Sequence, residues 1–135
     1  VKREIEKSDM SERFSLPGWV TPEVVLEHFS KSDILFMPSL SEGLPVVGVQ
    51  ALAAGLAIVA SKIGGFLDLV DHEKNGYLID ALDIPAFVKA LRSLISDPEN
   101  LLRFREASVE KSLQFDIQKI VDQYQSILYD VLKGK

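Results

Sequence analysis

The sequence has no cysteine and only two histidines among its 135 residues. Without cysteine, neither a disulfide framework nor a thiolate metal site can form. His28 and His72 lie far apart in the chain and show no paired ligand spacing, so we expect no metal and no other cofactor. Long apolar runs are lacking too, because no run approaches the ~20 residues that a helix needs to span a membrane.

Positive charge is scarce as well. Fifteen Lys and Arg stand against 20 Asp and Glu, which gives a formal net charge of −5 and a pI of about 5.0. This balance argues against nucleic acid or an anionic membrane as a broad partner. A local phosphate site stays open, because the N–H groups at a helix N-terminus attract anions on an acidic protein too.

What is present is an ordinary globular composition, 47% hydrophobic and 26% charged, in a chain of the length of one domain, residues 1–135. Short apolar runs predict buried strands at 33–37, 56–60 and 77–79, and a weaker pattern predicts one at 13–16. Capping residues and helical spacing predict helices at 21–30, 45–54, 66–70 and 83–95, and two more that open at 97 and 116. Strands that alternate with helices indicate an α/β fold, a Rossmann-like parallel sheet flanked by helices with a helical C-terminal segment.

The spacing of apolar side chains predicts which faces are buried. Val25, Leu26 and Phe29 are expected to face inward from the first full helix. In the last helix, an apolar stripe at helical spacing predicts a packing surface. Trp19 is expected in the core, the commoner location for this residue, or beside the loop 17–21 as part of a pocket for a base.

Ligands of parallel α/β sheets bind beyond the carboxyl ends of the strands, which places the loops 17–21, 38–44 and 61–65 at the predicted site. The middle loop carries Glu42 and Gly43 directly before a helix whose free N–H groups suit a phosphate. A carboxylate repels phosphate but accepts hydrogen bonds from neutral hydroxyls, such as those of a sugar. An anion site beside such an acid indicates a nucleotide sugar.

The motif order around this loop resembles that of the retaining GT-B glycosyltransferases of the large group 1 family. That family has two acids separated by seven residues; Glu42 occupies the first position, and Gln50 stands at the second. The flanking segments SDILFMPSLSEG and QALAAGLAIVASKIGGFLD fit the family pattern, as do the later NGYLI and the spacing of Phe115, Ile120 and Tyr124. The resemblance covers about residues 12–132.

The resemblance implies two Rossmann-like domains with the active site between them. This chain would be most of the C-terminal, donor-binding domain, without the N-terminal acceptor domain that is its expected partner. Glu42 would be the catalytic contact to hydroxyls of the transferred sugar, and Gln50 would contact the ribose. Further contacts to the donor sugar and phosphates would come from Ser41, Gly43, Leu44, Pro45, Val46, Lys62, Gly64 and Gly65.

The implied activity is transfer of a sugar from a nucleoside diphosphate to an acceptor hydroxyl with retention, in polysaccharide or glycolipid synthesis, with no metal. The chain alone is expected to be inactive. The implied location is the cytoplasm or the inner face of the membrane, with any membrane contact made through the absent half.

Several alternatives stay open at this point. Gln50 is either a ribose contact or a helix residue bonded to neighbouring backbone, and Lys62 is more commonly a solvated loop lysine. Gly64 and Gly65 could form a simple turn, and Asp68 fits a structural role better than a catalytic one. The chain could also be a non-catalytic nucleotide-sugar-binding or interaction domain. A Rossmann-like oxidoreductase is disfavoured, because no strand is followed by G-x-G-x-x-G.

Overall fold

The centre of the protein is a parallel sheet of three strands in the order β1-β2-β3, in a computed structural model that describes residues 2–134. The strands are β1 (Ile34–Met37), β2 (Ala57–Ser61) and β3 (Gly76–Ile79). Met37 is aligned with Ala60, and Ser61 with Ile79, so all three carboxyl ends lie at one edge of the sheet. The three main strands and the parallel α/β fold class are therefore confirmed, with strand bounds within one residue of those predicted.

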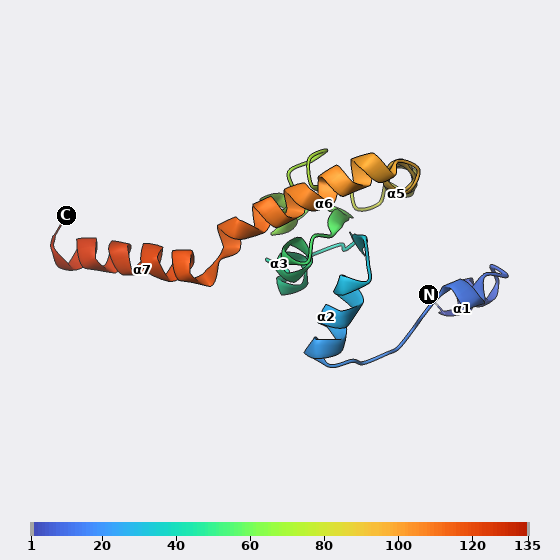
Figure 1. The fold of residues 1–135 in the computed structure, drawn as a ribbon, viewed down its shortest axis with the longest axis horizontal. Coiled ribbons are helices and arrows are strands. Elements are labelled where there is room, and N and C mark those ends of the chain that lie inside the picture. Colours follow the sequence, from blue (N-terminus) through green and yellow to red (C-terminus); the bar gives the residue numbers. More distant parts are fainter. Residues whose placement is uncertain (1, 135) are drawn as a thin grey trace.

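Helices cover both faces of the sheet (Figure 1). On one face lie α2 (Pro22–Ser30), α3 (Val46–Ala53) and α4 (Phe66–Leu69). On the other face lie α5 (Ile84–Ile95) and α6 (Pro98–Ser112). The helix α6 is long enough to contact α3 as well, which joins the two layers beside the sheet.

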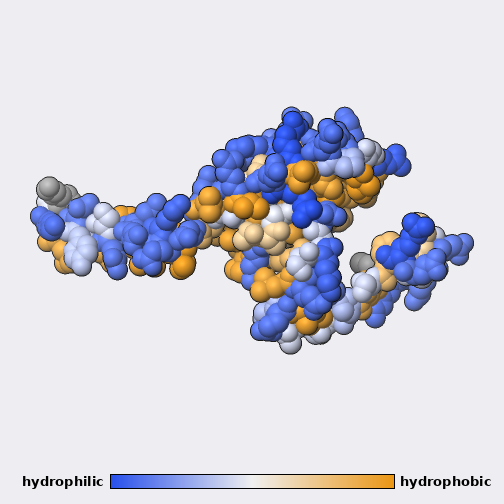
Figure 2. Space-filling model, viewed as in Figure 1, coloured by the Kyte–Doolittle hydropathy of each residue, from blue (hydrophilic) through white to orange (hydrophobic). Residues whose placement is uncertain are grey.

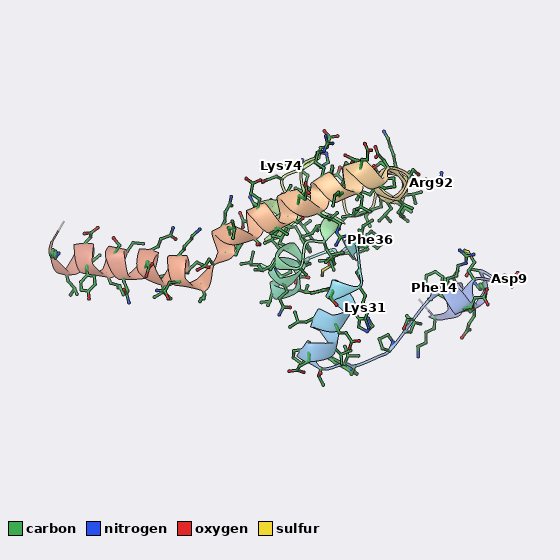
Figure 3. The ribbon with its side chains drawn as sticks, viewed as in Figure 1. Asp9, Phe14, Lys31, Phe36, Lys74 and Arg92 are labelled. Carbon is green, nitrogen blue, oxygen red and sulfur yellow. The ribbon has the colours of Figure 1, made fainter. Side chains whose placement is uncertain are left out.

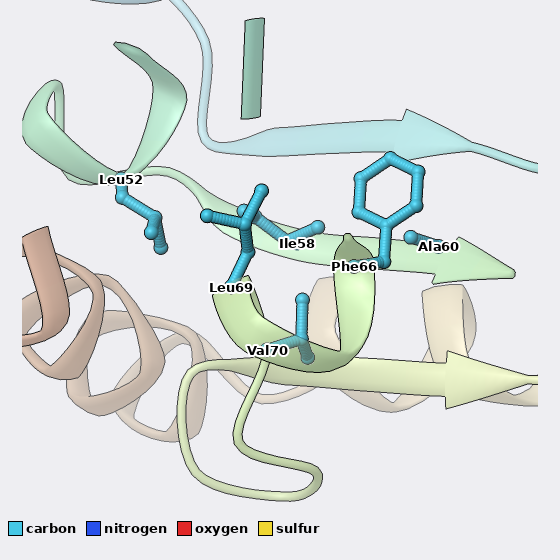
Figure 4. Packing of buried hydrophobic residues seen from close by; sticks show 6 residues of the cluster. All are labelled: Leu52, Ile58, Ala60, Phe66, Leu69 and Val70. Atoms are coloured by element: carbon cyan, nitrogen blue, oxygen red, sulfur yellow. The ribbon is translucent and has the colours of Figure 1, made fainter. Parts of the chain in front are cut away.

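The core is built on β2, the middle strand, whose residues are all wholly buried. Ile58 and Ala60 point to the layer of α3 and α4, where they meet Phe66 and Leu69 (Figure 4). The alternate residues of β2 point to the α5 and α6 layer. A strand covered on both faces needs apolar side chains at every position, which explains the continuous run of the sequence. Full burial of a side chain such as Ile58 contributes about 1.5–3 kcal/mol.

The strand β1 is less buried than the sequence indicated. Within residues 2–134 it pairs with β2 alone, so its outer edge is free. Phe36, labelled in Figure 3, keeps 45% of its surface exposed. Its ring still packs edge-on against Phe87 at a centroid distance of 5.5 Å. The expectation of a strand buried on both faces therefore holds for β2 and is wrong for β1.

Local signals account for the starts of α5 and α6 and for the end of α3. The side chain of Asp83 accepts from the N–H of Ala86 at the start of α5, and that of Asp97 accepts from the N–H of Asn100 at the start of α6. Gly55 follows α3 with a φ of +72°, a conformation that glycine adopts at little cost.

The start of α2 differs in detail from its predicted cap. Thr21 is the residue before the helix, but its side chain caps no backbone N–H. It forms a hydrogen bond with the Glu23 side chain instead, and this bond, followed by one from the backbone N–H of Glu23, lowers the pKa of that carboxyl.

Residues 2–20 lie apart from the sheet (Figure 1). They contain α1 (Lys2–Glu6) and a single 3₁₀ turn, Ser11–Arg13, so the strand predicted at 13–16 is wrong. A strand needs a partner for its backbone, and no strand of the described chain lies beside this segment. Trp19 is fully exposed, so its placement in the core is also wrong. Leu26 is half exposed on α2, contrary to the inward orientation predicted for it.

The last helix, α7 (Ile117–Leu132), follows a short 3₁₀ turn at Leu113–Phe115 and extends away from the body (Figure 1). None of its residues is buried. Its predicted apolar stripe is present and forms one side of the helix in Figure 2, but Ile117, Tyr124 and Val131 are exposed. The stripe is therefore uncovered within residues 2–134, and its role as a packing surface stays a prediction.

Candidate functional site

The carboxyl edge of the sheet brings together two of the three loops that the sequence singled out. Residues 38–45 follow β1 and residues 62–65 follow β2. The loop 17–21 follows no strand, because residues 13–16 are not one, and so it has no place at the carboxyl end of a strand. The predicted site thus reduces to two neighbouring loops and the start of α3.

Glu42 lies at the tip of the first loop, half-buried between exposed neighbours, Ser41 and Gly43. Its carboxylate makes no hydrogen bond or ion pair within the described chain, residues 2–134. A carboxylate in a loop that is bound by nothing else keeps its acceptor capacity for a ligand. The geometry is therefore compatible with the predicted role in accepting hydrogen bonds from hydroxyls.

The N-terminus of α3 differs from those of the three helices that follow α4. Pro45 precedes the helix and offers no capping side chain, and the first turn holds no acidic residue. The carbonyl of Pro45 accepts from the N–H groups of Gly48 and Val49, while those of Val46 and Val47 have no acceptor in residues 2–134. By contrast, α5, α6 and α7 each begin with a capping aspartate. The dipole of α3 places about half a positive charge at this end, which favours an anion there.

The second loop lies directly against the first. The N–H of Gly65 donates to the carbonyl of Gly43 at 3.0 Å. A methyl group at Gly64 would overlap the carbonyl oxygen of Glu42, and one at Gly65 would overlap the backbone of Leu44. Gly65 is buried, whereas Gly64 is exposed. The two glycines thus contact the loop that carries Glu42, and their predicted contact to the donor stays a prediction.

Gln50 lies inside α3, one turn beyond Val46, and is half-buried. Its side chain makes no hydrogen bond to any residue from 2 to 134, so the alternative of a glutamine tied to neighbouring backbone finds no support. Its backbone carbonyl accepts from Ala54 in the ordinary helical pattern. Helical side chains tilt toward the N-terminus, which leaves the amide of Gln50 free to reach toward the loop edge.

Lys62 begins the second loop and is exposed. Its backbone N–H donates to the carbonyl of Ile79 at 2.7 Å, which extends the pairing of β2 with β3 by one bond. Its ammonium group forms no ion pair in the described part of the chain, so its positive charge is unpaired there. Asp68 is exposed on α4; its backbone N–H donates to the carbonyl of Gly65, and its carboxylate has no hydrogen-bond partner among these residues.

The structure adds two groups that the sequence did not single out. The amide of Val47 is as free as that of Val46, because the first hydrogen bond at the start of α3 runs from the N–H of Gly48 to the carbonyl of Pro45. Ser61, the last residue of β2, is wholly buried, and its hydroxyl has no partner in residues 2–134. The sequence gives no sign of either, since both depend on hydrogen bonds that form only in the folded chain.

No group of three or more His, Asp or Glu that could hold a metal ion occurs among residues 2–134. Of the two histidines, His72 accepts at Nδ1 from the N–H of Leu78 and so completes a bond at the outer edge of β3. No helix in the same range is long and apolar enough to cross a membrane.

Comparison with known families decides what this arrangement belongs to. The model of the family "Glycosyl transferases group 1" matches residues 1–111, most of the chain. The chain belongs to the glycosyl transferases group 1 family. An uncharacterised glycosyltransferase of Haemophilus influenzae is 38% identical over 102 residues, which cover 75% of this chain and 29% of that protein.

Two further relatives agree with this family membership. UDP-Gal:alpha-D-GlcNAc-diphosphoundecaprenol alpha-1,3-galactosyltransferase of Escherichia coli is 30% identical over 129 residues, 94% of this chain and 32% of that enzyme. The Anabaena protein HepE, solved in complex with UDP, has a TM-score of 0.84 at 22% identity, over 96% of this chain and 35% of its own.

The group 1 chain described here therefore spans about a third of the length of these relatives. Its parallel sheet with helices on both faces matches the corresponding part of GT-B glycosyltransferases. Glu42, Gln50 and the free start of α3 all lie within the region that the family model covers.

Proposed function

We propose that this group 1 domain binds a nucleoside-diphosphate sugar and that the full-length protein transfers the sugar to an acceptor hydroxyl with retained configuration. One observation carries the proposal: α3 begins with free amides and no acid in its first turn, directly after a loop that carries an unpaired carboxylate, Glu42. The two features suit the two ends of a sugar diphosphate.

The proposed chemistry divides between these two ends. In the transfer, the bond between the anomeric carbon and the diphosphate oxygen breaks, and the acceptor oxygen bonds to that carbon while its hydroxyl loses a proton. Negative charge grows on the departing diphosphate, so the amides of Val46 and Val47 would stabilise the transition state more than the ground state. Glu42 would orient the sugar through its hydroxyls. We propose that no metal takes part, because backbone amides and the helix dipole supply the stabilisation.

UDP is the nucleotide that we propose to test first. HepE was solved with UDP, and the name of the Escherichia coli relative specifies UDP-Gal. Gln50 would accept from a ribose hydroxyl, the position at which the family pattern has an acid. An amide is a weaker acceptor than a carboxylate, so a second reading, a binding domain with little catalytic power, remains the alternative to the enzyme.

We propose that the acceptor-binding half covers the surfaces left open here. These are the free outer edge of β1, the exposed Trp19 and the apolar stripe of α7. Large exposed apolar surface, such as the stripe of α7, usually marks an interface. A cytoplasmic location, polysaccharide or glycolipid products and the acceptor itself remain predictions.

A panel of nucleotides tests the proposal. We expect UDP, GDP or ADP, and the matching nucleotide sugars, to raise the unfolding temperature of the chain, with titration calorimetry giving the affinities. A ligand at 100 times its dissociation constant stabilises by about 2.7 kcal/mol. The free nucleosides serve as controls and should bind far more weakly, since they offer no phosphate to α3. If no diphosphate binds, or if NAD or FAD binds instead, the proposed function is wrong.

A further inference from the structure

The turn after β2 makes contact with the Glu42 loop through backbone alone. Gly65 donates its N–H to the carbonyl of Gly43 at 3.0 Å. A Cβ at Gly65 would lie within 3.0 Å of three backbone atoms of Gly43 and Leu44, and a Cβ at Gly64 would lie as close to the carbonyl of Glu42. Backbone atoms cannot rotate aside as the end of a side chain can, so any side chain here forces the two loops apart.

Conformation explains only one of these glycines. Gly64 has a φ of +47°, in the left-handed region that glycine tolerates best. Gly65 has a φ of −67° and a ψ of −8°, which any residue adopts. Space is therefore the reason for glycine at position 65, and that space is taken by the backbone of Gly43 and Leu44.

The turn is itself fixed to the core. Phe66 and Leu69 of α4 follow directly and are wholly buried against β2 and Leu52 (Figure 4). On the other side, α3 approaches α4 so closely that a Cβ at Gly48 would lie 2.5 Å from Cδ1 of Leu69. The core thus holds α4, α4 holds the glycine turn, and the turn supports the loop that leads to α3.

We propose that Gly64 and Gly65 are positioning residues that set the place of Glu42 and of the free α3 amides, and that Gly65 does so without contacting the donor. The N–H of Gly65 is already used by Gly43, so it cannot also donate to a phosphate. This inference rests on the proposed function, because the positioned groups are those that would bind the sugar and the diphosphate. According to the inference, a side chain at Gly65 weakens donor binding because it displaces the loop that carries Glu42.

The test compares Gly64→Ala and Gly65→Ala with Gly55→Ala in the 135-residue chain. Gly55 is the matched control: it has a φ of +72° and a Cβ there would meet only a side-chain carbon of Val109, at 3.2 Å, and an oxygen at 3.8 Å, beyond the opposite end of α3. Backbone amide NMR signals are recorded without ligand. Affinities for UDP and for UDP-glucose, UDP-galactose and UDP-N-acetylglucosamine are then measured by calorimetry.

We expect the Gly64 and Gly65 variants to shift the amide signals of residues 42–44 in the absence of ligand. We also expect the preference for the bound UDP-sugar over UDP to fall by about tenfold, the value of one charge-assisted hydrogen bond. Gly55→Ala should change neither. Unshifted signals together with weaker binding would mean that the glycines contact the donor directly. Shifted signals with an unchanged preference would mean that the position of residues 42–44 does not affect sugar binding. Either result overturns the inference.

Hydrogen exchange on the unmodified chain keeps the inference testable if the variants fail to fold. The amide of Gly65 should exchange as slowly as those of β2, because its hydrogen bond joins a turn held by buried side chains. Fast exchange would overturn the inference without touching the proposed function. If the unmodified chain binds none of the nucleotides, the proposed function fails, and the positioning role fails with it.

Discussion

Glu42 and Gln50 stand at the two positions where the family pattern has acids, and they differ in charge. Glu42 is in a loop and half-buried, whereas Gln50 is held in α3. Neither side chain is bonded to another residue in the described range 2–134, so each is available to a ligand. Changes at these two residues are expected to affect different parts of the donor.

At Glu42, removal of the carboxylate should weaken the contact to the sugar and leave the contacts to the nucleotide unchanged. We expect Glu42→Ala in the full-length protein to lower sugar transfer by about one to two powers of ten, because a charge-assisted hydrogen bond to a sugar hydroxyl contributes roughly 1.5–3 kcal/mol. The affinity for UDP alone should stay the same. Glu99→Ala, at an exposed acid on α6, is the control. Equal losses for UDP and UDP-sugar would contradict the assignment.

At Gln50, restoring the acid should strengthen the ribose contact. A carboxylate can accept from both ribose hydroxyls, whereas an amide has one acceptor oxygen. We expect Gln50→Glu to tighten nucleoside-diphosphate binding by roughly 1 kcal/mol, measured by calorimetry. Repulsion from the diphosphate opposes this gain but is screened and less direct.

The control for Gln50→Glu is a 2′,3′-dideoxyribose nucleotide, which offers no hydroxyl and should show no gain. Unchanged or weaker binding of the ordinary nucleotide would mean that Gln50 does not face the ribose.

The start of α3 is less stabilised by its own sequence than the starts of α5, α6 and α7. Its first turn lacks the cap and the acid that would favour it, while α5, α6 and α7 each have a capping aspartate. An aspartate in the first turn of α3 should therefore have opposite effects on folding and on binding.

Val46→Asp provides this test, because Val46 is 69% exposed and its loss empties no core. We expect the variant to unfold at a higher temperature, by the roughly 0.3–1 kcal/mol that an acid adds at a helix N-terminus, and to bind UDP more weakly. Val46→Asn, of the same shape without the charge, should keep most of the affinity. If Val46→Asp binds UDP as well as the unmodified chain, the diphosphate does not lie at α3.

The elements also show where prediction from sequence succeeded. The caps at Asp83 and Asp97 act on N–H groups three residues away, so the local sequence was sufficient to find them. The strand predicted at 13–16 failed because Phe14 and Leu16 have an apolar pattern but no neighbouring strand to pair with. The prediction that Leu26 faces inward was wrong for a related reason. Spacing predicts that a helix has an apolar face, but the elements packed against the helix determine how much of that face is covered.

At the scale of the whole molecule, the exposed surfaces bear on how this chain would contact the rest of the full-length protein. The outer edge of β1 is unpaired within residues 2–134, and Trp19 is fully exposed. The helix α7 extends away from the body with its apolar stripe exposed (Figures 1 and 2). The chain covers only about a third of the relatives it matches. We therefore expect this chain to bind the donor, and transfer of the sugar to require the full-length protein.

We expect the 135-residue chain to bind a nucleoside diphosphate but to transfer no sugar, because nothing in the proposed site would hold an acceptor. The measurement is release of UDP from a radiolabelled UDP-sugar with an added acceptor, compared with the full-length protein under the same conditions. Sustained transfer by the chain alone, above the rate of the Glu42→Ala variant, would contradict this prediction.

The sequence by itself determined the three strands of the sheet, the starts of α5, α6 and α7 and the loop that carries Glu42, because each depends on residues close together in the chain. Tertiary structure decided that Gly64 lies against the backbone of Glu42, 22 residues earlier in the chain, and Gly65 against that of Leu44, 21 residues earlier. It also decided that Trp19 and α7 are uncovered. Periodicity shows that a face is apolar, but which segment covers that face depends on strand order and on packing between distant parts of the chain.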